Sequence, residues 1–559
     1  MLRFIALSGT TGVTENLNVY EYQDEMIILD CGVGFPDLEM PGVDLVIPDF
    51  SYVVKNKHKL KAIVLSQGHE DHIGALPFLL RNLPAQAGVN VPIYCAPLVR
   101  EFLEEKFRDN GITDFKINTF DPTKDTFQIG SFKISPFRVA HSVPDTVGFA
   151  IETPEGKIMH VPEHKIDQQS VDGMPFDLIR AKTLSEGNVI CLISDCLGSN
   201  EPGFTESGQE IEERMFKIAS ISQKALFISA MSSSIGRFQQ MINVAVRLRR
   251  KVVFVGRSIQ NKTESAHKLG YLKYLDEQVV DFKKARKMHP RDLMYIIAGC
   301  YGQVGSSVYR LATDDDDRIS ATEGDTFIFS ANPAPPYSKE SQDFVIDELI
   351  DKGVDVHYYD LKEGLHVSGH GGQEDIKMLF NITKPKYFIP TGGTIKHMHS
   401  YEKLVVSTGK PKNNVFKLKP GDSVEFKNLP AQAGVIATRG QKISVKEVMV
   451  HGLGVGDIGK TVLEHRTLLG KQGMVVVVLK TTKNGKVFGK AEIVSKGFVF
   501  EGISGGLLND SIQRLMKHLG THNNLNSKKL KEETIKFLEG YFFKSTGRSP
   551  MILPIVVEV

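Results

Sequence analysis

Two histidines and an aspartate fall within four residues at His69, Asp71 and His72, directly after the apolar run that ends at Leu65. Imidazole and carboxylate groups are ligands that zinc takes from proteins, and a tight turn after a buried strand can direct them into one pocket. Ordinary surface histidines are the alternative, which the dense spacing disfavours. The cluster therefore predicts a metal centre at the end of a strand.

Two later segments carry ligands of the same kind. His141 stands in the run Ala-His-Ser-Val-Pro-Asp, and residues 158–167 contain His160, Glu163 and His164. Because these residue types repeat the donor chemistry of the first cluster, they are candidates for the same metal site.

A glycine-rich segment, His366-Val-Ser368-Gly369-His370, follows much later in the chain. Small residues let backbone N–H groups approach a phosphate, and serine and histidine side chains add donors. The segment predicts a phosphate contact. A glycine-rich turn with buried histidines is the alternative.

The elements that must position these residues are of α/β type. Short apolar runs that end at polar turns predict buried strands, with helical patterns between them, as at 98–107. From 204 to 348 strands and helices alternate, which predicts an open parallel sheet with crossover helices. After 348 the first pattern resumes, and a small α/β part ends the chain. Clear strand predictions are Glu25–Asp30, Lys61–Ser66, Val189–Ser194, Lys251–Gly256, Lys386–Pro390 and Gly473–Lys480.

Composition limits the class of protein. The chain has 559 residues, 41% of them hydrophobic and 24% charged, which indicates a globular protein of several domains. Its formal charge of +2 leaves nucleic-acid binding to local basic patches rather than a global field. The five cysteines are scattered without a Cys-x-x-Cys pair, which disfavours disulfides or a thiolate zinc site. With no run long enough to span a membrane, we expect a cytoplasmic location.

One octapeptide, Asn-Leu-Pro-Ala-Gln-Ala-Gly-Val, occurs at 82–89 and again at 428–435. Neither copy carries chemistry, and we interpret the repeat as a duplicated loop insertion.

The motifs and their order resemble the ribonuclease J family, which combines a metallo-β-lactamase fold with an inserted β-CASP domain. The histidine cluster is similar to the metallo-β-lactamase signature His-x-His-x-Asp-His, and the likeness covers nearly the whole chain. It includes Leu29–Asp37, Gly42–Asp49, His141–Asp145, Ser194–Asp195, Gly256–Ser258, Phe329–Pro333, His366–Gly371, Val450–Gly459 and Pro550–Pro554.

The resemblance implies an α/β fold in several domains. A metallo-β-lactamase αββα sandwich would be formed by residues 1–204 and 349–430, with a β-CASP α/β domain inserted at 205–348. A linker at 431–449 would lead to a small C-terminal α/β domain at 450–559.

The resemblance also implies a two-zinc site with seven ligand positions. Four keep the family's residue and three are substituted, by Gln67, Glu163 and Gly392. An amide is a poorer zinc ligand than imidazole, glutamate displaces the carboxylate by about 1 Å, and glycine offers no side chain. The expected metal ligands are His69, Asp71, His72, His141 and Glu163, with one or two zinc ions, or alternatively manganese or magnesium. Candidate surrogates are His164, His397 and His399.

Single-stranded RNA, engaged at its 5′ end, is the implied substrate. The catalytic candidates are Asp71, Asp195 and His370, the last as a proton donor. The candidates for RNA or phosphate binding are His366, Ser368, Gly369, His370, Arg237 and Arg257. Guanidinium groups bind phosphate in a bidentate manner, although a surface ion pair is the alternative for either arginine.

Three functions are compatible with the sequence. The first is a ribonuclease that hydrolyses RNA from the 5′ end or internally with an impaired or altered metal site. The second is a catalytically inactive RNA-binding paralogue that acts as a subunit of an active ribonuclease complex. A small-molecule hydrolase is disfavoured, because the insert and the glycine-rich segment imply a polymer. The resemblance implies a homodimer or a heteromer with a related ribonuclease.

Overall fold

The computed structural model describes residues 1–37, 39–83, 91–171, 173–333, 338–429, 434–482, 486–498, 501–521 and 525–559, with the backbone alone at 501–505. Most of the first copy of the repeated octapeptide and half of the second fall outside these residues, so the interpretation of the repeat stays a prediction. Chain contacts divide the protein into two units, residues 1–35 with 45–448, and residues 36–44 with 449–559.

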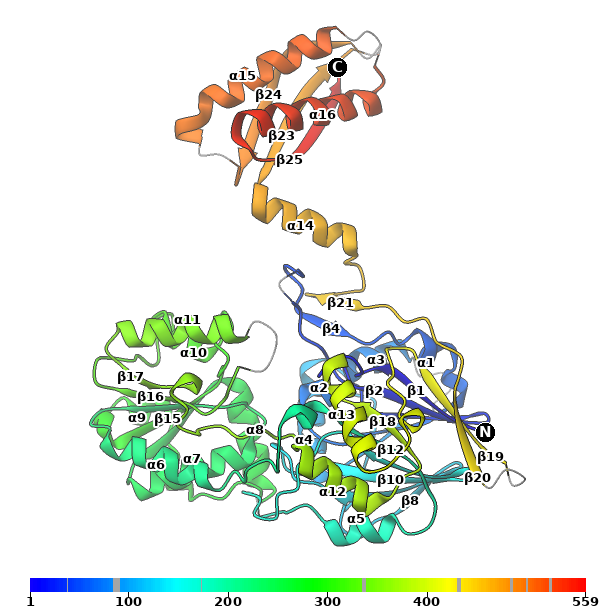
Figure 1. Ribbon diagram of the computed structural model, residues 1–559. Coiled ribbons are helices and arrows are strands. Elements are labelled where there is room, and N and C mark those ends of the chain that lie inside the picture. Colours follow the sequence, from blue (N-terminus) through cyan, green and yellow to red (C-terminus); the bar gives the residue numbers. More distant parts are fainter. Residues whose placement is uncertain are drawn as a thin grey trace. The chain divides into compact units, whose positions relative to one another are not determined.

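Two sheets form the larger lobe of the first unit (Figure 1). The first contains β1 (Leu2–Ser8), β2 (Leu17–Tyr22), β3 (Glu25–Leu29), β5 (Leu60–Val64), β6 (Pro92–Cys95), β7 (Lys116–Thr119), β19 (Ser423–Leu429) and β20 (Gly434–Arg439), in the order β20-β19-β1-β2-β3-β5-β6-β7. The second contains β8 (Phe127–Ile129), β9 (Phe132–Arg138), β10 (Val147–Thr153), β11 (Gly156–Val161), β12 (Val189–Asp195) and β18 (Tyr387–Thr391), in the order β18-β12-β11-β10-β9-β8. The short strand β4 spans Leu45–Ile47.

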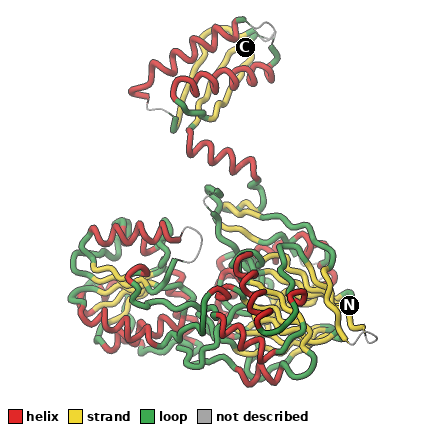
Figure 2. Tube along the Cα trace, viewed as in Figure 1, coloured by secondary structure: helices red, strands yellow, loops and turns green. Residues whose placement is uncertain are grey.

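Helices flank the sheets, red beside yellow in Figure 2. They are α1 (Ser51–Lys55), α2 (Glu70–Ile73), α3 (Leu76–Asn82), α4 (Pro97–Asp109), α5 (Leu178–Leu184), α12 (Gln373–Thr383) and α13 (Ile395–Ser407). Leu379 of α12 and Tyr401 of α13 share one buried cluster with Leu192 of β12. Between the sheets, the rings of Tyr20 and His160 lie 6.0 Å apart. These layers are the αββα arrangement that the sequence predicts.

A parallel sheet forms the second lobe of this unit. It contains β13 (Leu226–Ser229), β14 (Lys251–Val255), β15 (Leu293–Ile297), β16 (Thr326–Phe329) and β17 (Asp355–His357), in the order β14-β15-β13-β16-β17. Its helices are α6 (Glu210–Ile221), α7 (Ile235–Arg247), α8 (Arg257–Lys268), α9 (Phe282–Ala285), α10 (Ser307–Ala312) and α11 (Ser338–Asp351). The lobes are joined by contacts such as the hydrogen bond from the Tyr271 hydroxyl to Asp145, at 2.7 Å.

The second unit has a sheet of three strands with two helices against it. Its elements are β21 (Val448–His451), β22 (Gly454–Val455), α14 (Lys460–Gln472), β23 (Met474–Thr481), β24 (Val487–Lys496), α15 (Glu501–Gly520), α16 (Ser527–Thr546) and β25 (Met551–Glu558). The strand order is β24-β23-β25. No described helix in either unit is long and apolar enough to cross a bilayer.

Three predicted boundaries shift. The parallel sheet continues to β17, beyond the predicted boundary at 348, because β17 pairs with β16. The large sheet continues through β20, inside the predicted linker 431–449, because β20 pairs with β19. Residues 36–44, predicted as part of the first domain, group with the second unit. The backbone N–H of Asp44 donates to the carbonyl of Val450 at 2.9 Å, which accounts for that grouping.

Candidate metal centre and RNA contacts

The predicted ligands follow the carboxyl ends of strands that run in one direction. Glu163, Asp195 and Gly392 follow or end β11, β12 and β18, which are parallel neighbours. His141 follows β9, which runs the same way because both are antiparallel to β10. Ligand sites in α/β sheets form at such carboxyl ends. The topology therefore brings residues that are far apart in sequence to one edge of the sandwich.

Two groups of donors share one carboxylate. His69, His141 and Glu163 form the first, Asp71, His72 and Glu163 the second, and the ligand atoms of each group lie within 4.8 Å of one another. Glu163 Oε2 lies 2.9 Å from His141 Nε2, and Oε1 lies 3.2 Å from His72 Nε2. All five sequence-predicted ligands thus converge on one place.

The other two substituted positions also face this place. The Gln67 side chain is fully buried and its Nε2 donates to Glu163 Oε2, while its Oε1 has no partner among the described residues. Gly392 directly follows β18 with φ +65°, and a Cβ there would lie 3.6 Å from Asp195 Oδ1. Gln67 therefore contacts the shared carboxylate through its amide nitrogen, and Gly392 contributes no side chain to the site.

The candidate surrogates do not join these groups. His164 is fully buried, and among the described residues neither of its ring nitrogens has a partner, yet it belongs to neither donor group. His397 Nδ1 accepts the backbone N–H of Thr394 at 3.1 Å and so caps α13. His399 is half exposed and lies 3.6 Å from Glu402. The described structure therefore supplies three side-chain donors for each group.

Asp30 is a positioning residue that the sequence analysis missed. Its Oδ2 lies 2.8 Å from His72 Nδ1. Ser66 donates its backbone N–H to Asp30 Oδ1 at 2.8 Å and its hydroxyl to Oδ2 at 2.7 Å. Such a carboxylate behind a ligating histidine fixes the ring and its tautomer. Although burial opposes it, the carboxylates of Asp30, Glu163 and Asp71 hold the pKa of His72 well above its usual value. The only sign of this role in the sequence is that Asp30 directly follows the buried strand β3.

His370 pairs with the second catalytic candidate. Its Nδ1 lies 2.7 Å from Asp195 Oδ2, while Asp195 Oδ1 accepts the backbone N–H of Leu197 at 2.8 Å. Burial opposes the charged form, but Asp195 raises the pKa of His370 to about 9. Next to it, the carbonyl of Gly369 accepts a hydrogen bond from His141 Nδ1 at 2.9 Å. This bond leaves His141 Nε2 facing Glu163.

The predicted phosphate contacts separate into two groups. His366 and Arg237 lie together: burial and the charge of Arg237 lower the pKa of His366 to about 4. Arg237 donates to Gln240 Oε1 at 2.9 Å, and burial lowers its own pKa to about 9. Ser368 Oγ accepts the N–H of His370 at 3.0 Å. Arg257 is exposed at the start of α8, and no hydrogen bond or ion pair among the described residues joins it to these groups.

Models of known families match four successive parts of the chain. They are the beta-lactamase superfamily domain at residues 26–179, the ribonuclease J beta-CASP domain at 223–349, the Zn-dependent metallo-hydrolase RNA specificity domain at 354–416 and the ribonuclease J C-terminal domain at 461–559. With the four-layer sandwich and the donor groups, they define a metallo-β-lactamase-fold protein with a β-CASP insert. The third of these models indicates a metal cofactor.

Full-length relatives place the chain within that class. Ribonuclease J2 of Bacillus subtilis is 31% identical over 100% of this chain and 99% of its own length. Ribonuclease J 1 of Streptococcus pyogenes is 32% identical, covering 99% and 97%, and ribonuclease J of Thermus thermophilus is 32% identical, covering 100% and 95%. The chain belongs to the ribonuclease J family, which confirms the predicted family and fold class.

A solved structure supports the fold alone. A protein of unknown function from Enterococcus faecalis superposes with a TM-score of 0.52 at 13% identity, over 76% of this chain and 99% of its own.

Proposed function

We propose that this protein is an RNA-processing phosphodiesterase of the ribonuclease J type that works with a reduced set of metal ligands. The observation that carries the proposal is the pair of three-donor groups that share Glu163. Catalytic zinc sites commonly have three protein ligands and keep a further position for water or substrate. Each group meets that minimum without Gly392.

The donor chemistry fits a metal ion. His69, His72 and His141 supply imidazoles, and Glu163 is a carboxylate that is 3% exposed. Gln67 lies beside Glu163 with its amide nitrogen toward that carboxylate, and its buried oxygen has no partner among the described residues, so rotation of the amide would present a further neutral ligand. Zinc suits a site in which imidazoles predominate better than magnesium does, and manganese is intermediate.

When bound, the metal supplies Lewis acidity and activates water for attack on a phosphodiester. The chain's own residues do the rest. His370, held by Asp195 and protonated at neutral pH, donates a proton to the leaving sugar oxygen. Ser368 and the Gly369 backbone contact the phosphate. Arg237 donates to the Gln240 amide oxygen and has no carboxylate partner among the described residues, and an RNA phosphate supplies the missing anion.

Metal content and RNA cleavage, measured on one preparation, test the proposal. We expect one to two metal ions per chain and slow degradation of 5′-monophosphorylated RNA. Both should be lost in His69→Ala/Asp71→Ala and kept in the surface control His399→Ala. A preparation without metal or cleavage that still binds RNA contradicts the proposal.

That contradicting result would establish the second candidate, an inactive paralogue that binds RNA beside an active subunit. The substitutions at Gln67 and Gly392 favour this candidate, because each removes an imidazole that the family uses. Mixing the chain with an active ribonuclease J and measuring the rate on RNA would then identify its role.

The assembly that we assign is a homodimer formed through the C-terminal sheet. Strand register places Val476, Val494 and Leu553 side by side, with Ile555 next along β25. Val494, Leu553 and Ile555 are 52%, 47% and 42% exposed, and no described helix covers this face. Apolar faces of this kind mark protein interfaces.

A further inference from the structure

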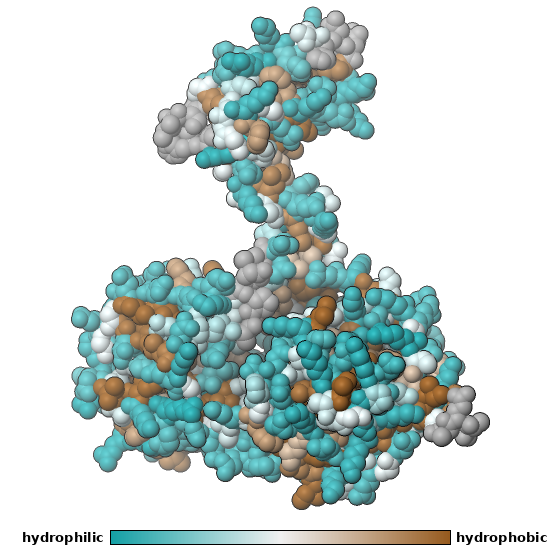
Figure 3. Space-filling model, viewed as in Figure 1, coloured by the Kyte–Doolittle hydropathy of each residue, from teal (hydrophilic) through white to brown (hydrophobic). Residues whose placement is uncertain are grey.

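Charge is distributed unevenly along the chain. Residues 449–559 contain 16 lysines and arginines against 9 acidic residues, whereas residues 1–448 contain 52 against 57. The C-terminal part therefore carries a formal charge of +7 and the remainder −5, which the total of +2 conceals. A surplus of this kind attracts polyanions. In Figure 3 the visible surface of this part is mostly hydrophilic, as a charged surface requires.

The edge strand β24 departs from regular pairing at one place. Its register with β23 shifts between Val478 and Lys480, so that residues 489–491 face the single residue Leu479. Gly489 has φ +74°, a left-handed conformation that favours glycine. Bulges of this kind re-aim side chains and leave backbone groups unpaired. Here the bulge carries a lysine, Lys490.

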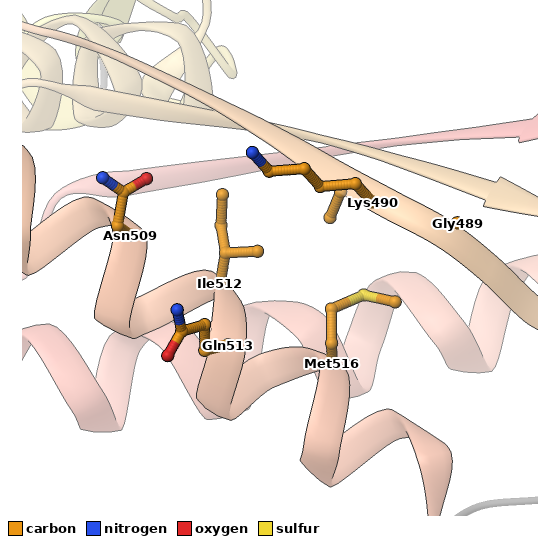
Figure 4. A pocket seen from close by; sticks show the side chains of 7 residues that line it. Gly489, Lys490, Asn509, Ile512, Gln513 and Met516 are labelled. Carbon is orange, nitrogen blue, oxygen red and sulfur yellow. The ribbon is translucent and has the colours of Figure 1, made fainter.

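A pocket of about 530 Å³ lies between this bulge and α15 (Figure 4). Lys490, Asn509 and Gln513 line it with one ammonium group and two amides, and none of these groups has a hydrogen bond or ion pair among the described residues. Ile512, which is 8% exposed, and Met516 supply an apolar surface beside them. The pocket therefore combines free donors and acceptors with an apolar wall and a cation.

We infer that this pocket binds a nucleotide of single-stranded RNA, a second RNA contact distinct from the metal centre; the inference rests on the proposed function. Amides of asparagine and glutamine donate and accept, as the edges of a nucleobase do. Ile512 and Met516 pack against the base, and Lys490 neutralises the adjacent phosphate. Lys486, exposed just before β24 begins, adds a second positive charge near the same end of the strand.

Lysines on an edge strand also protect a sheet from pairing with other chains. Edge protection requires only the lysine charge and does not involve the amides of Asn509 and Gln513 on α15. Variants of the amides therefore separate a built nucleotide site from simple edge protection.

Fluorescence anisotropy with a labelled single-stranded oligonucleotide, on the full chain at several salt concentrations, tests the inference. We expect Lys490→Glu to weaken binding about tenfold and to reduce the slope of log affinity against log salt by about 0.7, the value for one phosphate contact on a single strand. Asn509→Ala/Gln513→Ala should weaken binding by a similar factor without changing the slope. Lys544→Glu, the same charge change on the exposed face of α16, should have less than a twofold effect.

Wild-type affinity in both pocket variants, or an equal loss in Lys544→Glu, overturns the inference. Photo-crosslinking of 4-thiouridine RNA to the unmutated chain gives an answer independent of variant folding, with labelled peptides expected from β24 and α15. Crosslinks confined to the lobes of the first unit reject the pocket but leave the proposed function intact. Absence of any RNA binding or cleavage by the wild-type chain rejects the proposed function itself.

Discussion

Gln67 is the substituted ligand position that a single change can best restore. Its buried side chain already contacts Glu163, so an imidazole at this position would face the first donor group. We expect Gln67→His to raise the affinity for zinc by at least tenfold, since even changes behind the ligands alter affinity by about 10- to 100-fold. Titration against a chelating zinc indicator measures the change. Unchanged or weaker binding would show that the first group is not a metal site.

Asp30 controls the second donor group through His72. Because Asp30 fixes the ring of His72 and increases its basicity, Asp30→Asn should weaken metal binding by about 10- to 100-fold. The same titration measures it, and circular dichroism should show an unchanged fold. Asp24→Asn, in the turn between β2 and β3, is the matched control. Wild-type metal affinity in Asp30→Asn would contradict this role.

His160 makes stability depend on pH. It is fully buried and hydrogen-bonded to the Tyr20 hydroxyl at 2.5 Å, and burial, with the charge of His72, lowers its pKa to about 3. The folded protein keeps it neutral, whereas the unfolded chain protonates it below about pH 6.5. Its contribution to stability is therefore complete above about pH 6.5 and is lost as the pH falls toward 3, by at most about 1.4 kcal/mol per pH unit.

Urea unfolding at pH 7.5 and pH 5 checks this dependence. The loss of unfolding free energy between the two pH values should be smaller in His160→Asn than in the wild type. His465→Asn, on the exposed side of α14, should lose as much as the wild type. Identical pH dependence in all three proteins would show that another group is responsible.

At the scale of elements, α12 holds the glycine-rich segment through one carboxylate. Asp375 is fully buried and accepts the backbone N–H groups of Ile166, Thr205 and Gly372, at 2.7, 2.8 and 2.9 Å. Thr205 in turn donates to the carbonyl of His370 at 2.8 Å. The carboxylate therefore fixes the end of the segment that carries the proposed proton donor.

We expect Asp375→Asn to lower the free energy of unfolding by about 2–4 kcal/mol, because a hydrogen bond to a charged group contributes about 1.5–3 kcal/mol. Chemical denaturation measures the change. Lys377→Ala, which removes only a surface ion pair with Glu374 on the same helix, should change it by about 0.5 kcal/mol or less. A loss in Asp375→Asn no larger than in this control would contradict the assignment.

Elements with strong local signals could be predicted from the sequence, and short ones could not. The run Val189–Ser194 predicts a buried strand, and β12 spans Val189–Asp195 because a central parallel strand is apolar on both faces. The strand β17 has three residues, too few for a periodic pattern, so the predicted boundary at 348 fell before it. The strand β20 was missed because its partner β19, rather than its own sequence, defines it.

At the scale of the whole molecule, the proximity of the five candidate ligands was predictable because each lies in a recognisable motif. The supporting residues were not. Asp30 and Asp375 act through contacts 42 and 209 residues away in sequence, and no local pattern encodes such contacts. Arg237 and Arg257 had equal standing in the sequence, and the structure places only Arg237 near His366.

The C-terminal sheet gives a prediction about assembly. We expect the wild-type chain to sediment as a dimer and Leu553→Lys/Ile555→Lys as a monomer, because two charges then oppose burial of the apolar face. Phe543→Lys, which changes an even more exposed apolar residue on α16, is the control and should remain dimeric. A wild-type monomer that associates only with a co-expressed relative would replace the homodimer with a heteromer.

The left-handed backbone at Gly392 makes the loss of that ligand hard to reverse. At φ +65°, an L-residue costs about 1–2 kcal/mol before its side chain binds anything. A mutation back to histidine therefore begins with a penalty, and its benefit arrives only after the surrounding turn has relaxed. A change from histidine to glycine at this position is therefore easier than the reverse change. A lineage that has taken the step is left with three side-chain donors in each group, the smallest set that catalytic zinc sites commonly use.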